Sequence, residues 1–559
     1  MRNHIIATVR KAAAAAAVLV FYAIPALGQS AGGQPLAPEL TGLGSLEFTV
    51  TTRVPAAQRF FNQGLRLLYA FNHAESRRAF REAARLDPTL AMADWGEAMT
   101  WGPNLNAPMS VENGRLAYRA IQDARASAHS ASKRERGLID ALARRYAADG
   151  AGDRPALDAA YAAAMSHLAT QFPEDPDVLT LYADAMMNTM PWNYWQKDGK
   201  AKPETVPVMA ALESAIARDR DHAGAHHYYI HLLEASETPE RAEASADRLG
   251  TLMPAAGHMV HMPAHIYLRV GRYADAAEAN VRAIAADEDY LAQCQAQGLY
   301  AVSYYPHNLD FLWTAATLEG RRAVAVEAAR QVAAKVPHHH AGAVAWTAHF
   351  PVTPMLAYVR FGFWKDILLE PAPPKDQPYA QGIWHYARAL AFVAQDRFDR
   401  ARTEHRELDA IIEAKKDLPL LANLQIASRM VGGELAARRG EWHHAVRLLE
   451  EAVTIEDTLP YNEPPVWHHP VRQVLGAVLL DAGRAPDAER VYREDLARVR
   501  ENGWSLFGLT QSLRAQGKAT EAAEAHARFQ KAWSRADVTL TSSRIMPPQV
   551  TTVVDPKGH

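Results

Sequence analysis

Apolar residues recur three and four positions apart over much of the chain, which is the period of an amphipathic helix. The stretch Asn62–Met99 contains two such helices in succession, and further helical segments follow in residues 110–172. Later units begin near residues 343, 378, 418, 464 and 500. Because one helix pair cannot bury its own apolar stripe, the pattern predicts stacked pairs that share a continuous core. We expect an all-α protein of about ten to twelve helix pairs.

The first helix pair carries particular residues at the positions that tetratricopeptide repeats (TPRs) reserve for small, aromatic and helix-ending side chains. These residues are Gly64, Ser76, Phe80, Ala83 and Pro88. Proline ends a helix because its ring and its missing N–H cannot continue the hydrogen-bond ladder. The pattern predicts a TPR-type α-solenoid, a right-handed superhelix whose concave face is built mainly by the first helix of each pair.

The two ends of the chain differ from the repeats. A basic start, an apolar run over residues 12–24 and small residues near Gly28 predict a secretory signal peptide over residues 1–28, with an uncleaved anchor as the alternative. Residues 29–50 are rich in Gly and Pro and are expected to form a loose linker. The solenoid is assigned to residues 51–536. A polar tail over residues 537–559 is expected to be extended or disordered.

Charge and cysteine content narrow the classes of function. The formal net charge is −3, so no strongly basic field would attract nucleic acid. No second apolar run approaches membrane length, which predicts a periplasmic or secreted protein with no membrane span once the signal is removed. Cys294 is the single cysteine, which excludes an intrachain disulfide and a thiolate metal cluster. A metal site would therefore use imidazole, carboxylate, amide or thioether groups.

Two His-x-x-x-His pairs repeat at the TPR period. His227 and His231 form one pair, and His261 and His265 follow 34 residues later (261 − 227 = 34 and 265 − 231 = 34). Residues four apart lie on one side of a helix. Pairs on successive equivalent helices should therefore project from the same face of the solenoid.

Three further histidines share one position relative to the glycine turns between helices. The intervals are His258 to Gly271, His307 to Gly320 and His349 to Gly362, and each is 13 residues long. These histidines are therefore predicted on the first helices of consecutive repeats. In the TPR family those positions line the concave ligand groove.

Imidazoles at this spacing suit a transition metal. Two at i and i+4 can converge on one ion, and a third from a neighbouring helix can complete the set. We predict metal ligands, with copper favoured and zinc as the second choice, at six positions: His227, His231, His258, His261, His265 and His307. The arrangement superficially resembles coupled dicopper proteins, in which each copper takes three imidazoles. Binding of an acidic peptide, a pH sensor and structural packing are the alternatives.

Four residues are weaker candidates for contact with a ligand in the groove: His349, Asp310, Trp192 and Trp195. Asp310 could add a carboxylate beside His307. His468, far along the solenoid at a helix start, is interpreted as a packing or capping residue.

From Arg59 to Ala536 the chain resembles exported bacterial TPR proteins, in particular a histidine-rich branch. The segments that carry the resemblance include FNHAESRRAFREAARLDP, HHYYIHLLEA, GHMVHMPAHIYLRVGRY and NEPPVWHHPVRQVLGAVLL. TPR proteins in general imply protein or peptide binding. Imidazoles and aromatics here replace the Lys/Asn-rich lining of carboxylate-clamp repeats.

The sequence therefore predicts an exported solenoid that binds a transition metal, with a small molecule or peptide as the ligand of its groove. If the site is catalytic, a copper-dependent oxidoreductase is the first expectation and a metal-dependent hydrolase the second. The alternative is a periplasmic scaffold that binds a protein or peptide partner without catalysis.

Overall fold

The computed structural model describes residues 34–197, 199–294, 300–336 and 348–547. In these ranges the regular secondary structure is helical apart from two isolated bridges, Asn104–Ala107 and Trp195–Ala201. The predicted signal peptide, residues 1–28, lies outside them. None of the described helices is long and apolar enough to cross a bilayer.

The chain is an all-α TPR-type solenoid in which a first and a second helix alternate. The N-terminal pairs are α1 (Pro55–Tyr69) and α2 (His73–Leu86), α3 (Ala91–Trp101) and α4 (Val111–Ser127), α5 (Lys133–Leu142) and α6 (Arg154–Gln171), and α7 (Pro176–Met187) and α8 (Thr205–Arg218). The central pairs are α9 (Ala223–Leu233) and α10 (Glu243–Leu252), α11 (Gly257–His261) with α12 (Pro263–Val270) and α13 (Tyr273–Cys294), and α14 (Tyr305–Leu318) and α15 (Arg322–Lys335).

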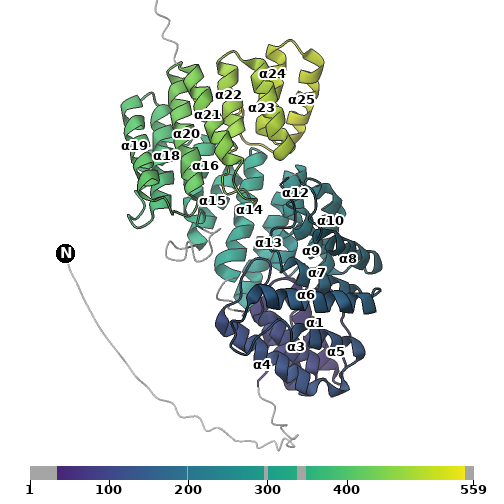
Figure 1. Ribbon diagram of the computed structural model, residues 1–559. Helices are drawn as coiled ribbons and strands as arrows, with labels where there is room; N and C mark the ends of the chain where they lie inside the picture. The colour runs from purple at the N-terminus through teal and green to yellow at the C-terminus, as the bar shows by residue number, and fades with distance from the viewer. Residues whose placement is uncertain (1–33, 198, 295–299, 337–347, 548–559) are drawn as a thin grey trace, which may run out of the picture.

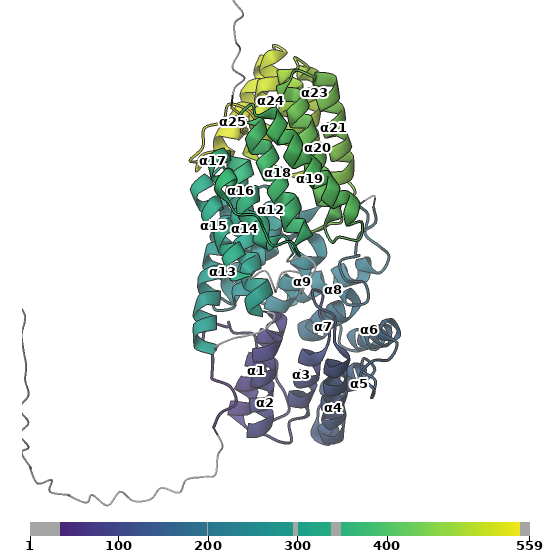
Figure 2. The same cartoon turned by 90° about the vertical axis from the view of Figure 1, so that its left-hand side faces the viewer.

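The C-terminal half continues the same alternation. Its pairs are α16 (Thr353–Phe361) and α17 (Trp364–Leu369), α18 (Pro378–Val393) and α19 (Phe398–Ala414), α20 (Leu421–Arg438) and α21 (Trp442–Glu456), α22 (Val471–Asp481) and α23 (Ala485–Arg498), and α24 (Gly503–Ala515) and α25 (Ala519–Ala532). Figures 1 and 2 place the N-terminal and C-terminal helices at opposite ends of an elongated body, with α12, α13 and α14 between them.

Small residues let neighbouring helices approach closely in the first repeat. The fully buried ring of Phe80 fills the space between α1 and α3. A Cβ added to Gly64 would lie 2.7 Å from this ring, and one added to Gly96 would lie 2.4 Å from it. The TPR pattern of small and aromatic positions therefore has its expected packing role here.

The turn glycines also have their expected place. Gly271, Gly320 and Gly362 follow α12, α14 and α16, with φ values of 82°, 72° and 72°. This left-handed conformation is easy for glycine, which lacks the Cβ that other residues would bring into collision. Each of these turns separates a first helix from a second one.

The solenoid curls far enough for its C-terminal repeats to contact the central ones. The Trp504 indole on α24 donates a 2.9 Å hydrogen bond to the carbonyl oxygen of Thr317 on α14. The Tyr273 hydroxyl on α13 donates to the carbonyl oxygen of Arg500. Arg500 also forms a 3.0 Å ion pair with Glu240. These contacts join residues that are 187 to 260 positions apart.

Both ends of the described chain pack more closely than the expected loose linker and tail. In the N-terminal segment Phe48 and Val50 are buried, and the backbone N–H of Leu40 donates to the Gln63 side chain at 2.8 Å. In the C-terminal segment Asp537 accepts from the backbone at the start of α15, and Ser543 is buried. Apolar side chains and paired polar groups in these segments outweigh their Gly and Pro content.

Candidate metal centre

The six histidines predicted as ligands lie in two groups of three. The first triad is His227 and His231 on α9 with His258 on α11. The second triad is His261 on α11, His265 on α12 and His307 on α14. Within each triad one nitrogen of every ring lies within 4.8 Å of the others. The structure thus brings the six together, while their role as ligands stays a prediction.

The two triads are neighbours. The ring centroids of His258 and His261 are 5.9 Å apart, and those of His231 and His265 are 5.8 Å apart. Residues 258 and 261 share α11, and a break at Pro263, which lacks an N–H, separates α11 from α12. The His261 and His265 rings nevertheless converge across this break.

Hydrogen bonds fix the tautomers of the second triad. The Asn280 amide donates from Nδ2 to the Ala276 carbonyl at 2.8 Å, so its oxygen faces His261 and accepts from Nδ1 at 2.8 Å. His265 donates from Nδ1 to a carboxylate oxygen of Glu234. Both Nε2 atoms therefore carry lone pairs when the rings are neutral, yet they lie 2.9 Å apart. A cation, either a proton or a metal ion, must hold them together.

The first triad is arranged in a similar way. His227 donates from Nδ1 to the carbonyl oxygen of Tyr69 at 2.6 Å, and His231 donates from Nδ1 to Glu234 at 2.7 Å. The Nε2 atom of His231 is buried and has no hydrogen-bond partner among the described residues. The Nε2 atom of His227 lies 3.1 Å from that of His258. The neutral rings of His227 and His231 therefore expose Nε2 lone pairs, as metal-binding imidazoles do, whereas His258, whose Nδ1 has no partner among the described residues, can donate its Nε2–H to His227.

Glu234 connects the two triads. It caps α9, is fully buried, and uses one carboxylate oxygen for His231 and the other for His265. Burial opposes its ionisation, but the two imidazoles outweigh burial and hold the pKa of Glu234 well below its usual range. The carboxylate is therefore the fixed negative charge of the centre.

Most of the rings are neutral near pH 7. Burial and the neighbouring imidazoles lower the pKa of His227, His258 and His261 well below its usual value, and that of His307 to about 3. His265 differs, because Glu234 outweighs burial and raises its pKa. Metal ions bind neutral imidazole, so five of the six rings could bind a metal without first losing a proton.

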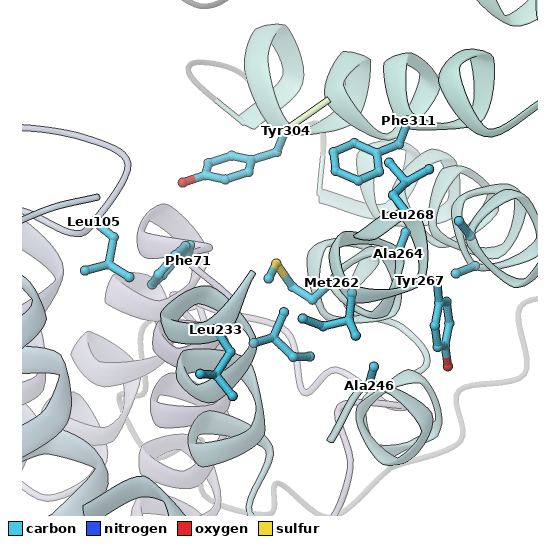
Figure 3. Close-up of a cluster of buried hydrophobic side chains, with 14 of the residues drawn as sticks. Phe71, Leu105, Leu233, Ala246, Met262, Ala264, Tyr267, Leu268, Tyr304 and Phe311 are labelled. Carbon is cyan, nitrogen blue, oxygen red and sulfur yellow. The ribbon is translucent and has the colours of Figure 1, made fainter. Parts of the chain in front are cut away.

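Aromatic side chains wall both triads. The Phe71 ring lies 4.7 Å from His227 and 5.4 Å from His258, and the Phe311 ring lies 4.5 Å from both His261 and His265. Figure 3 shows Phe71 and Phe311 on opposite sides of Met262, which is buried in the hydrophobic core. Such walls exclude water and strengthen electrostatic interactions inside the centre.

A cavity of ≈340 Å³ opens onto both triads, and we call it the histidine cavity. Its lining residues are Leu105, Asn106, Trp192, His231, Glu234, His258, His265, Tyr304, His307, Tyr461, Asn462 and Glu463. Trp192 thus lines the space where a ligand would sit. Trp195 is not a lining residue, and its indole donates to the Leu232 carbonyl at 2.8 Å.

Sequence reasoning missed several residues of the centre. Glu234 follows His231 by three positions on the same helical face, so its spacing could have identified it. Tyr461 and Glu463 come from residues 459–470, more than 190 positions beyond the second His-x-x-x-His pair. Only the curl of the solenoid brings them here. Burial raises the pKa of Glu463 to about 7.

The weaker candidates Asp310 and His349 form a separate cluster with His468, which we call the acid–histidine cluster. Asp310 accepts from His349 Nε2 at 3.0 Å instead of joining the second triad. His349 precedes a short 3₁₀ turn ahead of α16, so its interval to Gly362 does not place it in the histidine cavity. His468 lies 3.5 Å from Asp310, and its ring stacks on Trp313 with the centroids 3.9 Å apart, so it packs against two residues of α14.

Comparisons with known proteins find similarity among solved structures at low sequence identity. No family model matches the chain, and no curated protein matches it. A human IFIT1 dimer with m7Gppp-AAAA is similar at 13% identity over 86% of this chain and 91% of that one, with a TM-score of 0.31. Yeast Tom70 is similar at 12% identity over 83% and 90%, with a TM-score of 0.25. The P58(IPK) TPR domain is similar at 12% sequence identity over 59% of this chain and 89% of that one, with a TM-score of 0.18.

Proposed function

We propose that the chain binds two transition-metal ions, one at each histidine triad. The observation that carries the proposal is the pair of Nε2 atoms of His261 and His265, whose Nδ1 atoms are both engaged as donors. A buried pair of facing lone pairs is stable only around a cation, and a metal ion can take the place of the proton that His265 otherwise holds there. Each triad supplies three imidazoles, the donor number that catalytic sites use when they leave a position open for a ligand.

The donor set favours copper, with zinc as the second choice. Imidazole suits both metals, and copper(II) lies at the top of the affinity order of divalent first-row ions. Bound copper would supply redox chemistry, and bound zinc would supply Lewis-acid chemistry for hydrolysis. We therefore propose a metal-dependent oxidoreductase first and a hydrolase second. The proposal includes export to the periplasm or beyond, on the basis of the basic and apolar pattern in residues 1–28.

The chain's own residues have distinct tasks in this proposal. Glu234 orients one ring of each triad, and Asn280 orients another. Glu463 borders the histidine cavity with a pKa of about 7, so it can hold or release a proton at neutral pH. Trp192, Tyr304 and Tyr461 provide aromatic walls for a small ligand.

Metal analysis of protein purified without a His tag tests the proposal. After loading with Cu(II) and exhaustive dialysis, we expect at least two equivalents in the wild type and one fewer in His261→Ala/His265→Ala. The matched control is His443→Ala/His444→Ala, which changes an exposed pair on α21. Circular dichroism checks that each variant stays folded. A metal-free wild type, or equal metal content in all three proteins, would overturn the proposal.

A peptide-binding scaffold is the second candidate, and one observation favours it. A cavity of ≈500 Å³ adjoins the histidine cavity, and apolar side chains form much of its wall, including Leu268, Leu318, Leu420, Leu459, Val466 and Val499. The concave surfaces of helical-repeat proteins commonly bind extended partners. A protein that holds no copper or zinc but binds a peptide library with selectivity would support this function over the first.

A further inference from the structure

The acid–histidine cluster draws on three distant parts of the chain. Asp310 lies on α14, His349 precedes α16, and His468 precedes α22. Their side chains are 1%, 1% and 5% exposed. One ligand atom from each lies within 4.8 Å of the others. The fold thus concentrates a carboxylate and two imidazoles in a largely buried place that no single repeat could build.

The polar atoms of this cluster are poorly satisfied. Asp310 Oδ2 accepts from His349 Nε2 at 3.0 Å, but Asp310 Oδ1 has no hydrogen-bond partner among the described residues. Among the residues that the structure describes, neither ring nitrogen of His468 has a hydrogen-bond partner, and neither does His349 Nδ1. Buried polar atoms are normally paired, because leaving them unpaired forfeits the hydrogen bonds that they make with water.

An ion pair between Asp310 and His349 does not explain the third member. It satisfies one oxygen and one nitrogen, and it leaves His468 stacked on Trp313 at 3.9 Å with its nitrogens unused. The His468 Nε2 atom lies 3.5 Å from Asp310 Oδ1, which is too far for a hydrogen bond of ordinary strength. A small cation held by all three side chains would satisfy both the Asp310 oxygen and the His468 nitrogen.

We propose that Asp310, His349 and His468 bind a further divalent cation, separate from the two triads. Two imidazoles and one carboxylate form a harder donor set than three imidazoles, and such a set suits Fe(II), Mn(II) or Zn(II). Asp310 follows His307 by three positions on α14, so this third site lies beside the second triad along one helix face. The proposal does not rest on metal at the triads.

Mn(II) is the probe that separates the sites, because imidazole-only triads bind it more weakly than any other first-row divalent ion. Electron paramagnetic resonance of free Mn(II) gives the number bound to the full chain. We expect one tightly held Mn(II) in the wild type, at least a tenfold weaker affinity in Asp310→Asn, and no change in His261→Ala/His265→Ala. The last variant distinguishes failure at the triads from failure at the acid–histidine cluster.

A second variant guards against loss of folding. His468→Gln retains a polar side chain, and its thermal melting reports whether the fold survives. Mn(II) affinity lost in a folded His468→Gln protein supports the site. No Mn(II) bound by the wild type, or unchanged affinity in Asp310→Asn, overturns it. A more stable Asp310→Asn protein with unaltered Mn(II) binding would make Asp310 a structural partner of His349.

Discussion

At the scale of single residues, the centre depends on which ring nitrogen carries a hydrogen. Spacing predicted the six histidines: four as His-x-x-x-His pairs repeated at a period of 34, and His258 and His307 by their common interval to a glycine turn. The same reasoning could not find the acceptors that fix their tautomers. The Tyr69 carbonyl and Asn280 belong to other helices, so their spacing from the histidines does not identify them. Glu234 could have been identified, because it follows His231 by three positions.

Glu234→Gln should weaken metal binding at both triads. The amide keeps the size of the carboxylate but has one oxygen, so it can accept from only one of His231 and His265. We expect roughly a 10- to 100-fold loss of copper affinity, the usual effect of losing an outer partner of a ligand. Isothermal titration with a competing chelator measures it. The control is Glu456→Gln, a half-buried acid whose pKa is raised to about 8 by desolvation and which is therefore already neutral near pH 7. Equal affinities in the two variants would contradict the assigned role.

The same variant should change the pH dependence of binding. Glu234 raises the pKa of His265, so in the wild type a proton competes for its Nε2 atom, and copper affinity should rise as the pH passes upward through this raised pKa. That proton stabilises the metal-free fold fully below about pH 6.5, and its contribution is lost at higher pH. In Glu234→Gln the rise in affinity should move to lower pH. Titrations from pH 5 to pH 9 test this, and an unmoved profile would refute it.

At the scale of helices, the sequence pattern located the repeats well. The small and aromatic positions of the first pair and the glycine turns after α12, α14 and α16 all have their predicted structural roles. The thirteen-residue interval failed for His349, because the chain there forms a 3₁₀ turn before α16 instead of a longer first helix. An interval in the sequence predicts where a residue lies in space only where the helix between the two positions is continuous.

Gly96→Ala should destabilise the first repeats. The new Cβ would lie 2.4 Å from the Phe80 ring, which cannot retreat because Gly64 closes its other side. Overpacking of this kind costs about 1–3 kcal/mol and outweighs the gain in helix propensity. Gly250→Ala on α10 is the control, since its nearest neighbour is 3.5 Å away; it should be stabilising by about 0.5–1 kcal/mol. Thermal melting should therefore shift in opposite directions, and a shift in the same direction would contradict the packing described.

At the scale of the whole molecule, the repeat pattern predicted a solenoid but not how tightly it curls. Superhelical curl is the sum of small rotations between successive pairs, and no local pattern encodes that sum. The sequence therefore could not identify Tyr461, Glu463 and His468 as site residues, although they lie beside Glu234 or Asp310 in the structure.

Metal binding should stabilise the central repeats selectively. The proposed ions connect α9, α11, α12 and α14, and a ligand present at a hundred times its Kd contributes about 2.7 kcal/mol. Hydrogen–deuterium exchange should therefore slow in these helices when copper is added. Helix α19, which contributes no residue to the triads, should exchange unchanged. Uniform protection, or none, would argue against ions at the triads.

The hydrogen bond from the Trp504 indole on α24 to the Thr317 carbonyl on α14 limits how the protein can be shortened. In most repeat arrays each unit touches only those next to it, so removing a terminal unit uncovers only its neighbour. Here Trp504 and Arg500 belong to the last two repeats yet contact α14 and the turn after α9. Deleting the final helices would therefore uncover the middle of the molecule, so engineered fragments should keep both halves together.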